Sequence, residues 1–222
     1  MAIQLFIGVV TEGTTDIRFL TTILENVFLD IAVDCLNEVS IDGIIFFDAE
    51  GDGFVEKMLN ASTKGVQEYG ISILCVHTDQ DRDTEIYNHK ITPLQNALFT
   101  KNSDSYCKVI VPIIPIRMIE AWMLADKELL KERIYGYNFR DVDLGLHREP
   151  ETYADPKNAI ENAIRIAQEN RPKKRRDEIT ISELYSEIGN SIKLEKLRAL
   201  PSFLDFEKNV RNAFIQLHYL VE

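Results

Sequence analysis

The sequence has few cysteines and lacks long apolar runs. Its three cysteines, Cys35, Cys75 and Cys107, share no motif spacing, so they predict neither a disulfide framework nor a zinc-type cysteine pair. No apolar stretch approaches the ~18 residues of a membrane-spanning helix. Residues 1–10 run directly into a strand pattern and lack the basic segment of a signal peptide. We therefore expect a cytoplasmic protein that does not enter a membrane.

Several familiar catalytic and ligand-binding motifs are also missing. The turn Thr11–Asp16 lacks the Gly-Lys pair of a Walker loop, and the Gly-x-Ser-x-Gly elbow of serine hydrolases does not occur. The acids from Asp79 to Asp83 begin like an EF-hand loop. The sixth position of that loop would be Thr84 and the twelfth Lys90, where calcium loops need Gly and Glu. The sequence thus excludes these three kinds of site.

The overall charge is acidic, but one segment is strongly basic. A chain of 222 residues suits one large domain, or one domain with an appendage. A net charge of −11 disfavours a nucleic-acid partner unless metals or a basic patch intervene. Such a patch occurs at residues 171–176, which either form a solvated linker or contact a phosphate backbone. The residues that would make this contact are Lys173, Lys174, Arg175 and Arg176.

Apolar strands alternate with amphipathic helices in the first part of the chain. Such alternation predicts an α/β fold with a mostly parallel sheet flanked by helices. The prolines in the last predicted strand, Pro112 and Pro115, either disfavour a central position for it or end the strand near Pro112. The predicted strands are at 4–10, 43–47, from 71 and at 108–116, and the predicted helices at 17–31, 54–69, 87–98 and 118–130.

The residue pattern of the sequence changes after about residue 131. Aromatic and polar residues without a clear period are followed by segments with helical spacing and capping residues. The helices predicted there are at 158–170, 182–189, 194–200 and from 202 onward. We therefore divide the chain into an α/β domain at 1–130 and a helical C-terminal appendage at 131–222.

Acids follow the predicted strands at the edge where parallel sheets bind ligands. Asp79 and Asp81 come directly after a buried strand, and Glu12 follows the first strand. If the chain stays extended, Asp79 and Asp81 point to the same side, and both stay ionised only with a cation between them. Hard oxygen ligands suit Mg²⁺ or Mn²⁺. The structural alternative is that these aspartates make turns or cap helices.

Two further acids extend this set. Asp16 and Glu120 both stand at predicted helix starts, where an acid stabilises the helix macrodipole. Glu120 also lies in an apolar segment, where a lone acid needs a partner. Each is therefore either a metal ligand or a structural helix-start acid.

The acidic segments resemble the Toprim domain of topoisomerases, primases and OLD-type nucleases. Residues 10–16, around Glu12, resemble the glutamate turn that opens many Toprim domains, and Thr78–Asp81 resembles the domain's Asp-x-Asp. In the OLD-like branch a second acid often follows four residues after the glutamate, which is the place of Asp16. The resemblance implies a Toprim-like (Rossmann-like) fold.

Other segments resemble small stand-alone Toprim-like proteins, a family long labelled as of unknown function. These are residues 119–126, Asp155–Lys157 and residues 194–203. Relatives of this type are often encoded beside ABC-type ATPases in anti-phage systems. The resemblance therefore implies nucleic acid and an ABC-type ATPase as partners, and it leaves a homo-oligomer open.

The activity that the resemblance implies is hydrolysis of phosphodiester bonds in DNA or RNA by a Mg²⁺- or Mn²⁺-dependent nuclease. Glu12, Asp79 and Asp81 would be catalytic and bind metal, with Asp16 and Glu120 completing one or two metal sites. The catalytic lysine of OLD nucleases is not identified by the sequence, and the candidates by position are Lys90, Lys101 and Lys108.

The alternative function is non-catalytic. The acidic charge and the missing lysine favour a metal-binding Toprim-like module that docks on a partner ATPase and regulates it.

Overall fold

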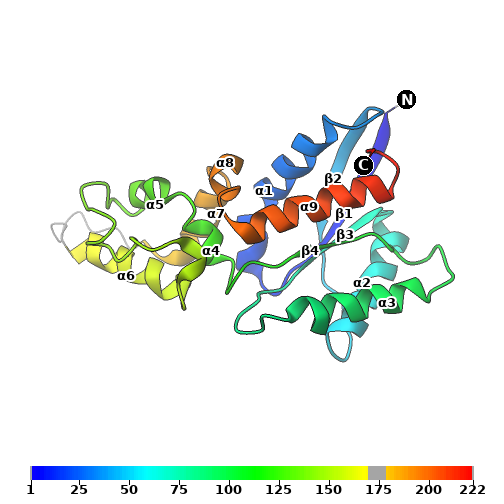
Figure 1. Ribbon diagram of the computed structural model, residues 1–222, viewed down its shortest axis with the longest axis horizontal. Helices are drawn as coiled ribbons and strands as arrows, with labels where there is room; N and C mark the ends of the chain where they lie inside the picture. Colours follow the sequence, from blue (N-terminus) through cyan, green and yellow to red (C-terminus); the bar gives the residue numbers. More distant parts are fainter. Residues whose placement is uncertain (1, 170–178, 222) are drawn as a thin grey trace.

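The computed structural model describes residues 2–169 and 179–221 and is built on a four-stranded, all-parallel sheet. The strand order is β2-β1-β3-β4 (Figure 1). The strands are β1 (Ile3–Val10), β2 (Val39–Phe46), β3 (Ile73–His77) and β4 (Ile110–Ile113). All five residues of β3 are buried, as expected for a central strand covered on both faces. The predicted α/β class with a parallel sheet is therefore confirmed.

The helices cover both faces of the sheet and form a further group at one end. Figure 1 shows the sheet between α1 and α9 on one side and α2 and α3 on the other. The helical segments are α1 (Thr14–Ala32), α2 (Phe54–Tyr69), the π-helix η1 (Tyr87–Ile91), α3 (Thr92–Phe99), α4 (Glu120–Met123), α5 (Lys127–Arg133), the 3₁₀-helix η2 (Pro150–Thr152), α6 (Pro156–Glu169), α7 (Ile181–Gly189), α8 (Leu194–Leu197) and α9 (Pro201–Gln216).

The side chains of β3 alternate between two hydrophobic cores, one on each face of the sheet. In β3, Ile73 and Cys75 face the core beneath α1 and α9, and Leu74 and Val76 face the core beneath α2 and α3. Neighbouring side chains on a strand point to opposite faces, so this apolar run serves both layers. The carboxyl end of β3 is held between two layers and is therefore a rigid platform for the residues after it.

Helix α2 approaches the sheet closely because of a glycine. A Cβ atom on Gly65 would lie 2.3 Å from Cδ1 of Ile71, which is too close for any real side chain. A side chain at Gly65 would thus force the side chains of Ile71 and Phe47, which pack beneath α2, to shift.

The prolines of the last strand agree with its place at the edge of the sheet. Pro112 lies within β4 and pairs in register with Val76 of β3. Because β4 is an edge strand, the missing N–H of Pro112 costs no hydrogen bond to a further strand. The strand is also shorter than the predicted segment 108–116.

The prediction of one continuous helix at 118–130 is wrong. The chain forms the short helix α4 and then the separate helix α5. Asp126 causes the restart, because its side chain accepts a hydrogen bond from the backbone N–H of Leu129 at 3.1 Å and caps α5.

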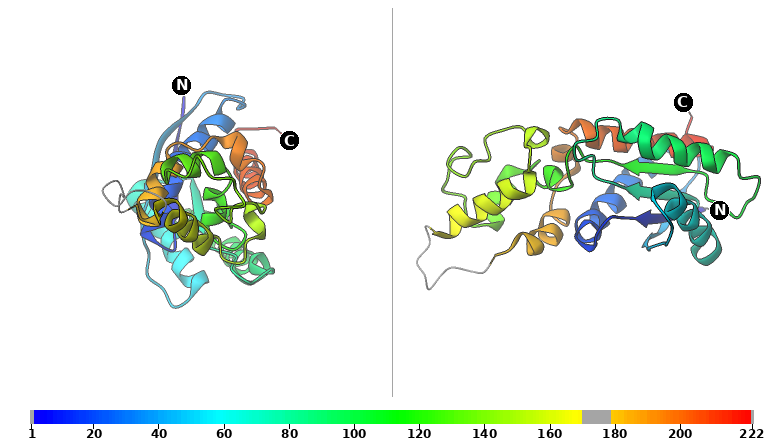
Figure 2. Two further views of the ribbon diagram at one scale, coloured as in Figure 1. Left: turned by 90° about the vertical axis from the view of Figure 1, so that its left-hand side faces the viewer. Right: turned by 90° about the horizontal axis from the view of Figure 1, so that it is seen from below.

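The residues after 131 extend the molecule but also return to the sheet. Helices α5 to α8 lie at one end of the elongated molecule (Figure 2), whereas α9 packs against β4 and α1. Gly189 lets α7 touch α1, because a Cβ there would lie 2.4 Å from the carbonyl oxygen of Phe19. The division at 130/131 stays a prediction, but one hydrophobic core crosses it.

Within residues 2–169 and 179–221, none of the helices combines the length and the apolar character needed to cross a membrane.

Candidate active site

A hydrogen-bonded chain of three side chains lies where β1 and β3 end. Lys90 Nζ donates to Thr78 Oγ1 at 2.6 Å, and Thr78 Oγ1 donates to Glu12 Oε1 at 2.7 Å. The ammonium of Lys90 is also 3.7 Å from that carboxylate oxygen. Thr78 is fully buried, whereas the side chain of Glu12 is half exposed. Glu12 and Lys90 thus form the solvent-facing part of the site.

The position of Lys90 depends on an irregular helical turn. The N–H of Thr92 bonds to the carbonyl of Tyr87, which is the wider spacing of a π-helix. Pro93 follows at once and has no N–H to donate, so the regular pattern cannot form there. The predicted helix at 87–98 is therefore a π-turn followed by α3. This turn places Lys90 over the ring of Phe54, with 5.3 Å between Nζ and the ring centroid.

Lys101 and Lys108 lie elsewhere. Both precede β4, at the edge of the sheet opposite to Glu12, and Lys101 lies over the ring of Tyr106. Of the three candidate lysines, the structure brings Lys90 alone to the acids.

A buried histidine lies between two of the predicted acids. His77 Nδ1 is 3.5 Å from Asp16 Oδ2, and His77 Nε2 is 3.4 Å from Asp79 Oδ1. The His77 side chain has no solvent exposure. Within the described residues, both ring nitrogens and Asp79 Oδ1 are buried without a hydrogen-bond partner. Buried polar atoms are normally paired, so these atoms mark a place with unmet bonding capacity.

Asp16 also has a structural role. Its Oδ2 accepts a hydrogen bond from the N–H of Gly13 at 2.8 Å, which caps the start of α1. The helix-start interpretation and the nearness to His77 and Asp79 therefore both hold for Asp16.

Glu120 reaches the same region from the start of α4. Its Oε1 accepts a hydrogen bond from the hydroxyl of Tyr185 in α7, and both residues are buried. Tyr185 is the partner that a lone acid in an apolar segment requires.

Asp81 lies on a turn and not on an extended segment. The chain turns at Asp81, which has a φ of 50° and is exposed. Its N–H donates to the carbonyl of Arg117 at 2.8 Å, and the Arg117 guanidinium donates to the carbonyl of Asp81 at 3.0 Å. The extended conformation that would align Asp81 with Asp79 is therefore absent, and its role as a metal ligand stays a prediction.

The buried acids influence one another electrostatically. Burial raises the pKa of Asp16, and the charges of Asp79 and Glu12 add to the increase, while His77 and the Gly13 N–H oppose it. Burial also raises the pKa of Glu120, opposed by the Tyr185 hydrogen bond and reinforced by Asp79. Titratable groups shifted by burial and by like charges in one crevice are typical of functional sites.

The donor atoms suit a hard divalent cation. The carboxylates of Asp16, Asp79 and Glu120 are oxygen donors, and Asp79 Oδ1 accepts no hydrogen bond from any residue that the structure describes. In the described ranges, no three His, Cys, Asp or Glu side chains are arranged as a complete metal site. A cation would therefore have to draw these carboxylates together.

The predicted phosphate contacts cannot be placed. Lys173, Lys174, Arg175 and Arg176 lie outside the described residues.

Sequence reasoning did not select three of the residues at this site. His77 belongs to no larger cluster of His and Cys residues in the sequence, Thr78 enters the sequence argument only as part of the Asp-x-Asp segment, and Tyr185 comes from a distant helix. The place of His77 and Thr78 at the end of the β3 strand was the available signal.

Comparison with protein-family models gave no match, and comparisons with curated proteins and with solved structures gave none. The fold defines an α/β protein with a parallel sheet, and the Toprim resemblance rests on the residues quoted above.

Proposed function

We propose that this protein is a Mg²⁺- or Mn²⁺-dependent nuclease that hydrolyses phosphodiester bonds. The observation that carries the proposal is the meeting of acids from three separate segments at the carboxyl edge of the sheet. Glu12 and Asp16 follow β1, Asp79 follows β3, and Glu120 follows β4. This is the edge where open α/β sheets bind ligands. Asp79 Oδ1, which is buried without a hydrogen-bond partner among the described residues, supports a cation among these acids.

The residues divide into a cation-binding part and a substrate-facing part. Asp16, Asp79 and Glu120 would hold the metal, which supplies an activated water and stabilises charge on the phosphate when bound. Lys90 is one-third exposed and lies 3.7 Å from Glu12, so its side chain can face a phosphate oxygen and stabilise negative charge that develops there. Glu12 is exposed enough to exchange a proton with substrate or solvent.

Lys90 also bears on the alternative function. The two reasons that favour the docking module are the missing lysine and the acidic charge of the chain. A lysine 3.7 Å from Glu12 weakens the first reason, while the net charge of −11 still favours the alternative. An ABC-type ATPase partner and a role in anti-phage defence rest on the resemblance and remain proposals.

The test is cleavage of plasmid, single-stranded DNA and total RNA with Mn²⁺ or Mg²⁺. We expect metal-dependent cutting by the wild type, and a loss of about 10²-fold or more in Glu12→Gln, Asp79→Asn and Lys90→Met. Matched controls are Glu25→Gln, an exposed glutamate on α1, and Lys101→Met, both of which should cut normally.

Cutting that persists in Asp79→Asn would refute this active site. If the wild type does not cut, the panel is repeated with the product of the neighbouring gene present. Failure there as well, together with retained metal binding, would favour the docking module.

A further inference from the structure

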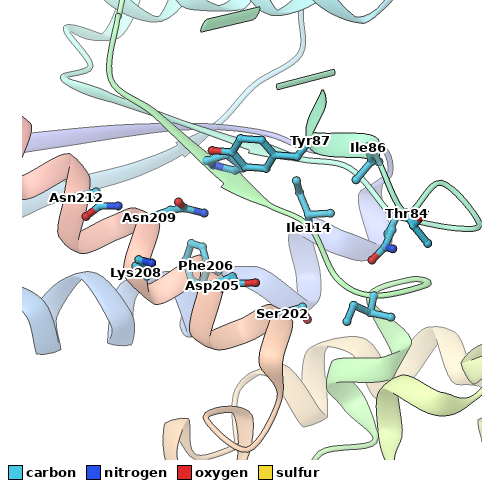
Figure 3. Close-up of a pocket in the computed structure, with 13 residues that line it drawn as sticks. Thr84, Ile86, Tyr87, Ile114, Ser202, Asp205, Phe206, Lys208, Asn209 and Asn212 are labelled. Carbon is cyan, nitrogen blue, oxygen red and sulfur yellow. The ribbon is translucent and has the colours of Figure 1, made fainter. Parts of the chain in front are cut away.

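A pocket of about 480 Å³ lies between the end of β4, the segment after β3 and helix α9. Figure 3 shows Tyr87 and Ile114 on one side of it and Phe206 and Asn209 of α9 on the other. The volume is within the range of small-molecule sites. The lining includes Gln80, Tyr87, Ile114, Lys208, Asn209 and Asn212.

The pocket adjoins the acids through the backbone. Gln80, in its wall, is the residue between Asp79 and Asp81. Its N–H donates to the carbonyl of Pro115 at 3.2 Å, and Pro115 stands between the lining residues Ile114 and Ile116. The wall of the pocket and the acidic loop are therefore one hydrogen-bonded unit. A molecule held in the pocket lies next to the proposed active site.

The lining combines a flat aromatic ring with unpaired polar groups. Tyr87 is 41% exposed and belongs to the same π-turn as Lys90. Across the pocket, Lys208, Asn209 and Asn212 share one face of α9 through helical spacing. In the part of the chain that the structure describes, these three side chains have no hydrogen-bond or ion-pair partner. Each amide offers both a donor and an acceptor.

We propose that this pocket binds one unpaired nucleobase of the strand whose phosphate lies at the acids. The base would stack on Tyr87 and against the aliphatic wall, since every base has a π-face. The amides of Asn209 and Asn212 would bond to the edge of the base, and Lys208 would face a neighbouring phosphate. The inference rests on the proposed nuclease function and assigns its substrate as single-stranded, or flipped out of a duplex.

The chemistry favours a base over an added peptide strand. A peptide that extended the sheet at β4 would meet Pro112, which has no N–H to pair with it. A base within a duplex is stacked and paired, so it can enter only after extrusion. The pocket therefore selects for strands whose bases are already free.

The test compares binding of a fluorescent single-stranded oligonucleotide with binding of the blunt duplex of the same sequence. It uses Glu12→Gln with Mn²⁺, so that cutting does not consume the probe, and fluorescence anisotropy as the readout. We expect the single strand to bind at least ten-fold more tightly. Adding Tyr87→Leu should weaken single-strand binding about ten-fold and leave duplex binding unchanged, and Asn209→Ala should weaken it less.

Tyr137→Leu is the matched control, because Tyr137 is also a solvent-exposed tyrosine, at 66% against 41% for Tyr87, but lies outside the pocket. Equal binding of single strand and duplex, or no change in Tyr87→Leu, would overturn the proposal. A change in sedimentation mass in Tyr87→Leu without a change in binding would also overturn it and assign the pocket to a second copy of the chain. If circular dichroism shows that Tyr87→Leu does not fold, the single-strand binding of Asn209→Ala decides whether the proposal holds.

Failure of the pocket and failure of the nuclease give different results. If metal-dependent cutting is unchanged in Tyr87→Leu and is equal for single strand and duplex, the nuclease proposal holds and the pocket proposal fails. If the protein never cuts but binds single strands preferentially and in a Tyr87-dependent way, the pocket proposal holds and the nuclease proposal fails.

Discussion

Two buried polar clusters in this molecule differ in how their atoms are satisfied. The first surrounds Trp122, whose indole N–H donates to Ser202 Oγ at 2.8 Å, while the Ser202 hydroxyl donates to Glu151. The rings of Phe203 and Phe206 pack on Trp122 with centroid distances of 5.0 and 6.0 Å. This cluster joins α4 to α9 with its polar groups paired.

The second cluster is the acidic one at the end of β3. There the two ring nitrogens of His77 and Asp79 Oδ1 are buried without a hydrogen-bond partner among the described residues, and the pKa of both Asp16 and Glu120 is raised. A paired cluster contributes stability, whereas an unpaired one costs stability unless a ligand satisfies it. The contrast separates a structural joint from a cluster whose hydrogen-bonding capacity is not met by the described residues.

The largest expected effect on stability is in the Trp122 cluster, which joins α4 to α9. Trp122→Ala should lower the free energy of unfolding by about 3–5 kcal/mol, because a large buried ring is lost. Ser202→Ala should cost about 1–3 kcal/mol, since the indole N–H then lacks its partner. Urea unfolding at pH 7 measures both. A loss below 1 kcal/mol for Trp122→Ala would show that α9 is not anchored through this ring.

The acidic cluster should behave in the opposite way. Without metal, Asp79→Asn should be at least as stable as the wild type, because it removes repulsion with Asp16 and Glu120. Excess Mn²⁺ should stabilise the wild type by about 2.7 kcal/mol at a hundred times its Kd. Thermal melting should show that Asp79→Asn loses this gain and that Asp104→Asn, at an exposed loop position, keeps it. Equal gains in the two variants would place the metal elsewhere.

The smallest expected effect is a dependence on pH in metal-free buffer. The folded-state pKa values of Asp16 and Glu120 lie above their ordinary values of 3.8 and 4.5. As the pH falls from 7 toward these values, the folded protein takes up protons before the unfolded chain does, so these two groups favour folding more at lower pH. The variant Asp16→Asn/Glu120→Gln lacks this contribution.

Urea midpoints at pH 7 and pH 5 measure this effect. At each pH, the urea midpoint of the wild type is subtracted from that of the double variant. This difference should be higher at pH 7 than at pH 5. A difference that grows as the pH falls would show that these carboxylates are stabilised in their charged form.

The parts of the fold that the sequence predicts are those that local patterns determine. The apolar run at Ile73–His77 and the stripe of α1 specify a buried strand and a helix beside it. The shared edge of parallel strands then brings Glu12, Asp16, Asp79 and Glu120 into one region without further information. The resemblance to Toprim domains adds a function to that geometry, which stays a prediction.

The parts that the sequence does not predict depend on backbone detail and on tertiary packing. Asp81 turns away because of one residue at positive φ, which period-two alternation cannot anticipate. Lys90 reaches Thr78 through a π-turn, whereas a regular helix would orient it differently. Tyr185 meets Glu120 from another helix, α7, and α9 returns to the sheet after several intervening helices. Contacts of this kind have no local signature.

The contact between Glu120 and Tyr185 has a consequence for protein synthesis. These residues are 65 positions apart in the chain, and the wall of the base pocket on α9 comes later still. Because chains emerge from the ribosome from the N-terminus and fold as they emerge, the acids around β3 exist before the helices that complete the site. A nascent or prematurely terminated chain would thus carry the acids without Tyr185 and without α9.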